Sequence, residues 1–530
     1  MGILVADSCW ADTAVLLLTA LYLLYWYATN TFDHWKKKGV PEVRNKVPFF
    51  GSMLESVTMK KQFSLHFQEL YWGLKGHKFG GIFQMKRPML VMMDPELIKD
   101  VMVKNFANFS DNVAIVSSKH DPMFAYNIFS MKGEQWKYAR SKLAPAFATG
   151  KIRNVFPLIM EICDELKKHL QRRIDSNDCE FKAHNLAAEY TTDVVGSCAF
   201  GIRCNSLIDP NNQFRKMGKD LMTPESVFRQ LQFMIIFTMP KIAEIFRLKL
   251  ISQQIEDFFR DLIGKAFAYR EKHPEFKRND FINLLMQLKK LGGLEVDETD
   301  KKEINRGLEK EASDKGKIEF NETVLTAQAV GFFIDGFETS SLALAFALHE
   351  LAMNPAVQEK LREELKKSFE ATDGKIDYDN IRSCTYLDNV LHETLRIYSP
   401  AGVLQRECTK RYTIPDTNIN LEVGDAVVIP VYPMHHDPTY FPCPEVFDPD
   451  RFTEEGKKTR PAFTYLPFGE GPRQCIGFRF AQAQVKAALA TIVLNFEVKP
   501  SKDTEHPVKF DQTNFLLRAK NGLNLKIAPL

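Results

Sequence analysis

An uncharged apolar run near the amino terminus constrains this chain more than any other feature. Residues 13–28 read TAVLLLTALYLLYWYA, with aromatic side chains at the far end, and three lysines follow at residues 36–38. Such a helix nearly spans a hydrocarbon core of about 30 Å, and the preceding residues can extend it. An aromatic belt followed by lysines indicates a single-pass anchor with the remaining chain in the cytosol. We therefore predict an anchor at residues 1–29, with a buried core helix as the alternative.

The rest of the chain has the pattern of one large helical body. Residues 30–51 are basic and contain prolines, which predicts a linker to a domain of residues 52–530. A stretch crowded with Lys, Glu and Asp predicts a flexible loop at about 289–317. Helical patterns are strongest at 155–172, 255–272, 354–369 and 481–495, and strand-like runs occur at 81–92, 424–430 and near 513–527. The predicted fold class is mostly α with small β-sheets.

Composition excludes two broad classes of protein. The chain has 70 Lys and Arg against 67 Asp and Glu, a net charge of +3 without a basic stripe, so nucleic acid is not an expected partner. Its nine cysteines are scattered and form no CxxC pair, so we expect neither a disulfide scaffold nor a zinc ribbon. The 41 phenylalanines indicate a large apolar core or cavity.

One cysteine lies in a setting that suits a thiolate. Residues 468–477 read FGEGPRQCIG and precede a helical pattern, so Cys475 lies in a glycine-rich loop at the start of a helix. The amino end of a helix and the nearby Arg473 both favour a negatively charged sulfur, which predicts a lowered thiol pKa. From spacing alone, Cys475 is a reactive thiol, a metal ligand or an inert buried cysteine.

This loop resembles FxxGxRxCxG, the haem-binding signature of the cytochrome P-450 superfamily of haem-thiolate monooxygenases. The defined positions are Phe468, Gly471, Arg473, Cys475 and Gly477. The resemblance covers essentially the whole chain and is greatest to insect microsomal members that oxidise xenobiotics and some endogenous lipids. It implies haem b as the cofactor, Cys475 as the axial ligand of its iron, and Phe468 and Arg473 as further haem contacts. A thiolate ligand donates electron density to iron and favours O–O cleavage.

Two further motifs match the same superfamily. Glu393 and Arg396 form an ExxR pair on one helical face, which alone is a weak signal. The resemblance implies that the pair lies buried behind the haem with Arg451, from FDPDRF at 447–452, and positions the cysteine loop. Most members have Glu where this chain has Asp450.

The third motif is WKYAR at residues 136–140. Trp136 and Arg140 can both donate hydrogen bonds to an anionic group. The resemblance implies that they bind a haem propionate and that Arg406 and Arg473 are further propionate partners. A surface arginine is the alternative for Arg406.

A long apolar helix is predicted from residue 321 to the proline at 355. By resemblance, Thr339 supplies a hydroxyl and Glu338 an acid for the two protons that O2 cleavage requires. From the residues alone, a buried helix with one polar notch is the alternative reading. Asp335, one turn before Thr339, and Phe332 are expected to face the substrate pocket.

Asp335 departs from the pattern, because most members carry Ala or Gly there. We weigh three roles for its carboxylate. It accepts a hydrogen bond from a neighbouring polar group, it selects a substrate with a basic nitrogen, or it esterifies a haem methyl. The third role belongs to a fatty-acid-hydroxylating branch that carries Glu, whose side chain is one methylene longer.

The resemblance implies a reaction that inserts one atom of O2 into a lipophilic substrate at the endoplasmic reticulum membrane. No GxGxxG fingerprint is present, so NADPH electrons must come from a partner, by resemblance NADPH–haemoprotein reductase and a small b-type cytochrome. Residues 228–250 are apolar and interrupted, and we expect them to roof the active site and dip into the bilayer. A haem-thiolate isomerase or dehydratase and a haem-based binding or sensing protein are the alternatives.

Overall fold

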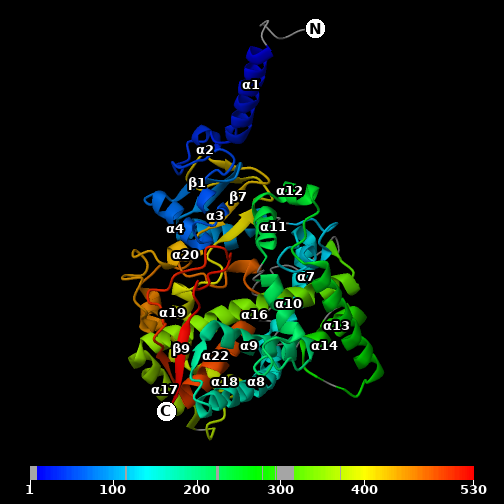
Figure 1. Cartoon of the computed structure of the whole chain (residues 1–530), viewed down its shortest axis with the longest axis vertical. Coiled ribbons are helices and arrows are strands. Elements are labelled where there is room, and N and C mark those ends of the chain that lie inside the picture. Colours follow the sequence, from blue (N-terminus) through cyan, green and yellow to red (C-terminus); the bar gives the residue numbers. More distant parts are fainter. Residues whose placement is uncertain are drawn as a thin grey trace.

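The computed structural model describes residues 9–530 apart from 114–115, 223–225, 277, 293, 295–315 and 371. Most of the chain forms one helical body, and α1 (Cys9–Thr29) projects from one end of it (Figure 1). The charged segment predicted to be a flexible loop lies largely outside the described residues.

The prediction of a mostly helical fold with small sheets is confirmed. The helices of the body are α2 (His34–Lys37), α3 (Leu54–Val57), α4 (Phe63–Gly73), α5 (Pro95–Lys99), α6 (Pro122–Ala125), α7 (Gly133–Leu143), α8 (Thr149–Asp175), α9 (Ala183–Val195), α10 (Gln213–Met222), α11 (Val227–Thr238), α12 (Pro240–Ile245), α13 (Gln253–Lys272), α14 (Phe281–Leu291), α16 (Glu322–Met353), α17 (Pro355–Glu370), α18 (Tyr378–Ser383), α19 (Thr385–Ile397), α20 (Val431–His435), α21 (Glu454–Lys458) and α22 (Phe478–Asn495). The strands are β1 (Phe79–Gln84), β2 (Arg87–Met92), β3 (Glu180–Lys182), β4 (Leu404–Glu407), β5 (Tyr412–Thr413), β6 (Asn420–Leu421), β7 (Ala426–Ile429), β8 (Phe496–Pro500) and β9 (Asn524–Pro529).

Local capping chemistry sets the limits of α16. The side chain of Asn321 accepts a hydrogen bond from the Val324 N–H at 3.1 Å and so caps the amino end. At the other end, Asn354 leaves the helical conformation because it precedes a proline. Pro355 then begins α17, where its missing N–H costs nothing.

The strands form three small sheets, and two of these sheets join segments that are distant in sequence. The run predicted at 81–92 is the β1–β2 hairpin, and β7 joins β2 in parallel to give the order β1-β2-β7-β4. Strands β3, β9 and β8 form a second sheet, and β5 and β6 a third. The strand expected near 513–527 is only partly present, because β9 begins at Asn524 and residues 513–523 form turns and bends.

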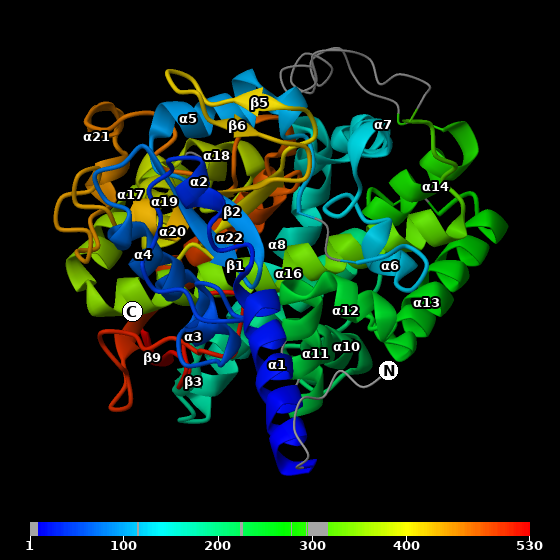
Figure 2. The same cartoon turned by 90° about the horizontal axis from the view of Figure 1, so that it is seen from above.

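Helix α16 is the centre of the body and passes through its middle in both cartoon views (Figures 1 and 2). Its side chains are buried on nearly all sides, as expected for a helix that is apolar all round. It packs most extensively against α9 and also contacts α6, α19 and α22. Side chains of α16 are therefore expected to form much of the lining of any interior cavity.

Segment 30–51 packs against the first sheet rather than extending away from the body. Trp35 is fully buried and its indole N–H donates to the Ile82 carbonyl at 3.1 Å. The Val43 N–H donates to the Gly81 carbonyl at 3.1 Å. The limits of the linker and domain stay predictions, but this segment is no free spacer, because its apolar side chains cover the sheet.

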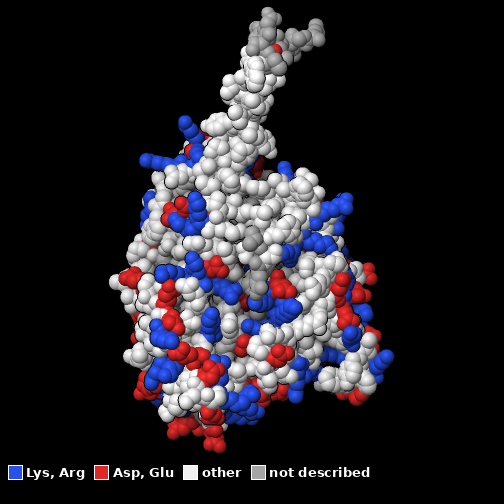
Figure 3. All heavy atoms as spheres, in the orientation of Figure 1, with Lys and Arg blue, Asp and Glu red and all other residues white. Residues whose placement is uncertain are grey.

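Both α1 and α16 are long and apolar enough to cross a membrane, but only α1 is almost wholly exposed. Figure 3 shows that α1 and the adjoining surface are mostly uncharged, whereas charged side chains gather farther from it. The carboxyl end of α1 is held against the body, because the Lys86 ammonium lies 3.4 Å from the centre of the Tyr27 ring. The structure thus leaves α1 as an apolar helix that can serve as an anchor.

Candidate active site

The loop that precedes α22 has a backbone only glycine can form. Gly471 has a φ of +73°, and a Cβ there would lie 2.1 Å from the Met102 carbonyl oxygen. The Cys475 N–H donates to the Phe468 carbonyl at 2.9 Å and closes the loop. This backbone holds the Cys475 side chain at the start of α22.

Cys475 is an exposed residue by accessible surface, although protein atoms surround its thiol closely enough to limit hydration. Burial raises the pKa of the thiol to about 11, although the Gly477 N–H and the Arg140 charge oppose the rise. The expectation of a lowered thiol pKa is therefore wrong for the metal-free protein, because desolvation outweighs the helix start. Metal binding would have to displace the proton.

Helix α16 lines a cavity of about 1040 Å³ with one stripe of side chains. The stripe consists of Ile334, Asp335, Thr339, Leu342, Ala345 and Phe346. The charge of Asp335 opposes ionisation of Cys475, which places the two groups within electrostatic reach of one another. The structure thus places Cys475 within electrostatic reach of the stripe on α16, although no residue of the cysteine loop is part of the cavity lining.

Thr339 and Glu338 differ in surroundings although they are adjacent. The Thr339 hydroxyl lines the cavity and donates to the Asp335 carbonyl at 2.5 Å. The Glu338 carboxylate is buried and lies 3.1 Å from Nε2 of His184, on α9. Burial raises the pKa of Glu338, but His184 and two arginines outweigh burial and leave the pKa below its ordinary value.

Sequence reasoning missed His184, which lies 154 residues before its partner and belongs to no motif. It lines the cavity as well as contacting Glu338. No local signal could have found it, because the close packing of α9 on α16 brings the two together.

Three predicted propionate partners form a cluster of buried guanidinium groups. Arg140 donates to the Gln474 carbonyl at 2.7 Å, and Arg406 donates to the Asn112 side chain at 2.7 Å. Burial lowers the pKa of both to about 10. Among the described residues, neither has a carboxylate partner.

Arg473, the third member of this cluster, makes more hydrogen bonds than Arg140 and Arg406. It donates to three backbone carbonyls of the segment 110–131, lies 3.5 Å from Asp111, and stacks 4.1 Å from the ring centre of Trp136. Burial lowers its pKa to about 9, and the charge of Arg406 contributes. Arg473 therefore holds this segment and Trp136 beside the cysteine loop.

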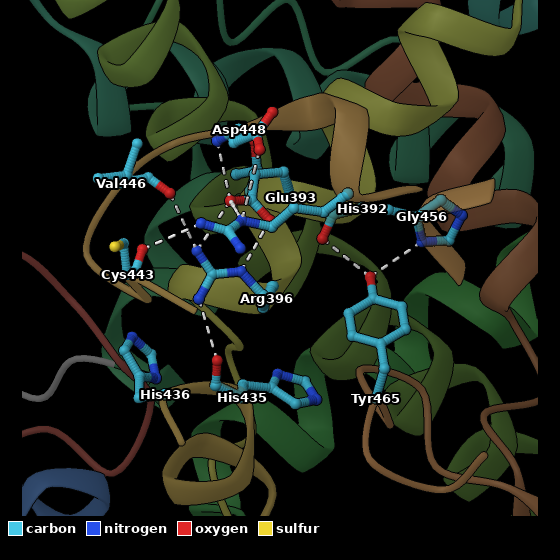
Figure 4. A network of polar contacts seen from close by, with 12 residues as sticks. His392, Glu393, Arg396, His435, His436, Cys443, Val446, Asp448, Gly456 and Tyr465 are labelled. Atoms are coloured by element: carbon cyan, nitrogen blue, oxygen red, sulfur yellow. Dashed lines mark hydrogen bonds and ion pairs between the residues drawn. The ribbon is translucent and has the colours of Figure 1, made fainter. Parts of the chain in front are cut away.

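The predicted structural triad is assembled (Figure 4). Arg396 pairs with both carboxylate oxygens of Glu393, at 2.7 and 2.8 Å, and both side chains are fully buried. Nε of Arg451 lies 3.3 Å from Glu393. Lys360 reaches Asp450, the departure from the usual Glu, at 2.9 Å on the surface, so this residue is not part of the triad.

His435 connects this triad to the cysteine loop, and no motif in the sequence predicted this role. Its carbonyl accepts from Arg396 at 3.0 Å, and its Nε2 accepts from the Leu466 N–H at 2.9 Å. Burial lowers the pKa of His435 well below its ordinary value, so the ring is neutral and can accept. Leu466 lies two residues before Phe468, where the loop begins.

Two aromatic predictions have different outcomes in the structure. Phe468 forms the loop with its carbonyl, and its ring centre lies 6.1 Å from that of Phe478. Phe332 is not among the residues that line this cavity, and its expected place in the substrate pocket stays a prediction. It lies at the edge of the stripe, where its ring packs on Phe281 and Phe480 at 4.8 and 5.4 Å between centres.

A model of the cytochrome P450 family matches residues 41–526, which include the cysteine loop, the triad and α16. The chain therefore belongs to the cytochrome P450 family. Membership supports a monooxygenase role with a haem-thiolate centre and O2.

Full-length relatives occur in insects. The chain is 40% identical to "Cytochrome P450 9e2" of Blattella germanica, over 97% of each chain. It is 35% identical to "Cytochrome P450 6k1" of the same species, over 97% of this chain and 96% of the relative. It is also 35% identical to "Probable cytochrome P450 6a20" of Drosophila melanogaster, over 97% and 98%. The similarity to insect members that was predicted from the sequence is confirmed.

Proposed function

We propose that this protein is a haem-thiolate monooxygenase of the endoplasmic reticulum membrane that inserts one atom of O2 into lipophilic xenobiotics or endogenous lipids. Electrons from NADPH arrive through a separate NADPH–haemoprotein reductase, with a small b-type cytochrome as a second candidate donor. The observation that carries the proposal is the exposed Cys475 within electrostatic reach of Asp335, which lines the cavity together with Thr339.

The donor set fits haem b. Cys475 offers one sulfur ligand, and Arg140 and Arg406 are two buried cations without a carboxylate partner among the described residues. The two propionates of a haem would supply the missing negative charges, because buried cations require pairing. Arg473, which stacks on Trp136, lies close enough to Arg140 and Arg406 to belong to the same cluster of cations.

When bound, the haem supplies the activation of O2. The residues of the chain would bind the haem and transfer protons to the reaction site. Glu338 is ionised at neutral pH, because its pKa lies below the ordinary value, so it must gain a proton before it can deliver one. Nε2 of His184, 3.1 Å away, is the group in contact with this carboxylate. The Thr339 hydroxyl, which donates to the Asp335 carbonyl in this structure, would have to rotate to offer its proton to the cavity.

Absorbance of the ferrous carbonyl complex tests the proposal directly. We expect the red-shifted band of a thiolate ligand, and NADPH consumption with product formation when reductase and a panel of lipophilic substrates are added. A band typical of a nitrogen ligand would overturn the thiolate assignment. A thiolate band without NADPH consumption on any substrate would favour the isomerase or sensing alternatives.

Thr339→Ala should uncouple NADPH consumption from product formation. The mutant lacks the hydroxyl of a residue that lines the cavity, so protons reach bound oxygen less well, hydrogen peroxide is released and the ratio of product to NADPH falls by about tenfold or more. Ser341→Ala is the matched control, because the Ser341 hydroxyl also bonds to its own helix, donating to the Glu338 carbonyl at 2.8 Å, but does not line the cavity. An unchanged ratio in Thr339→Ala would assign Thr339 to packing alone.

Deletion of residues 1–29 should weaken membrane binding without abolishing it. Phe228, Ile245 and Phe246 on and beside α11 and α12 are at least 70% exposed, and these helices lie toward the α1 end of the body (Figure 1). Vesicle flotation of the truncated protein should show residual binding. Adding Ile245→Ser and Phe246→Ser should reduce it by about tenfold or more, because each loses apolar area buried in lipid. Equal flotation of the two truncated proteins would contradict the roof assignment.

A further inference from the structure

Asp335 is a carboxylate inside the protein that the protein itself does not pair. It lies on α16 one turn before Thr339, and both side chains line the cavity. Among the described residues, no hydrogen bond or ion pair reaches the Asp335 carboxylate; its backbone carbonyl alone accepts, from Thr339. The structural role that we considered, acceptance of a hydrogen bond from a neighbouring polar group, therefore has no donor.

An unpaired carboxylate in such a place is costly. The side chain is exposed to the cavity, but the protein around the cavity limits its hydration, and this desolvation raises the pKa of Asp335 to about 7. A cation beside the carboxylate would remove this cost and keep the group ionised. The question is what supplies the cation.

The cations that line the cavity are engaged elsewhere or lie at its rim. Lys61 pairs with Glu55 and Glu69, Arg406 donates to Asn112, and Arg518 acts on Glu338. Other lysines of the lining are solvent-exposed, namely Lys182, Lys219 and Lys520. Exposed charges are screened by solvent and salt and contribute little at depth. A haem does not supply the cation either, since its charged substituents are carboxylates.

Much of the cavity lining is apolar. The lining includes Ile334, Leu342, Phe346, Val403 and Leu404. A cavity of about 1040 Å³ is at the upper end of the range for small-molecule sites, which leaves room for a ligand besides a cofactor. This combination suits a ligand with a lipophilic body and one positive nitrogen.

We propose that Asp335 is a specificity-determining anionic subsite that selects lipophilic ligands carrying an ammonium group. This inference rests on the proposed function and names a substrate class for the same cavity. The carboxylate contacts the cation, while the apolar wall contacts the remainder of the ligand. Because Thr339 is one turn away, carbons close to the nitrogen lie nearest the oxygen-activating residues.

Paired ligands of matched shape test this inference on the ferric holoenzyme. One ligand carries a trimethylammonium group on an alkyl aryl ether, and its partner has carbon in place of nitrogen. The quaternary nitrogen has no lone pair and cannot ligate iron. Dissociation constants from equilibrium dialysis should show that the wild type prefers the cation. Asp335→Asn should weaken cation binding by about tenfold or more and change binding of the neutral partner by less than about twofold.

Two further variants sharpen the comparison. Asp511→Asn removes the charge of another acid of the cavity lining, whose carboxylate already accepts from Thr513, and should leave the preference unchanged. Asp335→Glu retains the charge and should retain a preference for the cation. Equal losses for both ligands in Asp335→Asn would overturn the inference and reduce Asp335 to a packing role.

Failure of this inference is distinguishable from failure of the proposed function. Absence of a cation preference in the wild type overturns the subsite even if every variant loses its haem. The proposed function is tested separately by the ferrous carbonyl band and by product formation, neither of which depends on the charge of the ligand.

Discussion

Cys475→Ser should abolish product formation. The variant loses the exposed sulfur of the cysteine loop, and with it the electron donation that favours O–O cleavage. The ferrous carbonyl complex should lose its red-shifted thiolate band even in preparations that still contain haem. Cys475→His should fail in the same way, because a neutral imidazole donates less electron density than a thiolate.

Cys443→Ser is the matched control for this variant. Cys443 is also an exposed cysteine, and its contribution to the triad region is a backbone carbonyl that accepts from Arg451 at 3.0 Å. The serine variant should keep the spectrum and the turnover of the wild type. A Cys475→Ser protein with a normal thiolate band and normal turnover would show that another residue ligates the iron.

Arg396→Leu should cost about 3–5 kcal/mol of unfolding free energy and most of the bound haem. The substitution leaves the fully buried carboxylate of Glu393 with only Arg451 at 3.3 Å as a charged partner. It also removes the bond to the His435 carbonyl, through which the triad reaches Leu466 and the cysteine loop. Urea unfolding and haem content per chain are the measurements.

Lys360→Ala gives the comparison for a surface ion pair in the same region. Lys360 lies 2.9 Å from Asp450, and both side chains are more than half exposed. Its loss should cost less than about 1 kcal/mol and leave haem content unchanged. If Arg396→Leu were no more destabilising than Lys360→Ala, the triad would have no special role in holding the loop.

Short sequence patterns predicted those features of the protein that depend on residues close together in the sequence. The apolar period of α16, its Asn321 cap and the glycine-rich loop before α22 are all encoded within short stretches of sequence. Motif resemblance then suggested that Arg451 lies beside Glu393, although 58 residues separate them in the sequence.

The remainder depended on packing that no short stretch encodes. The contact of His184 with Glu338 arises where α9 crosses α16, and His435 connects two segments that share no pattern. The thiol pKa of Cys475 was misjudged for a related reason. A helix start is visible in the sequence, whereas the depth of burial that outweighs it is a property of the whole fold.

The hydrogen bond from Trp35 to Ile82 and the contact of Lys86 with the Tyr27 ring have a consequence for how the protein meets its substrates. Because these contacts join α1 and residues 30–51 to the helical body, we expect the body to keep a restricted orientation relative to the proposed membrane. A compound dissolved in lipid then reaches the protein by lateral diffusion in two dimensions. The concentration that governs its oxidation is the concentration in the bilayer, so apparent affinities measured in water should scale with the partition coefficient of the compound.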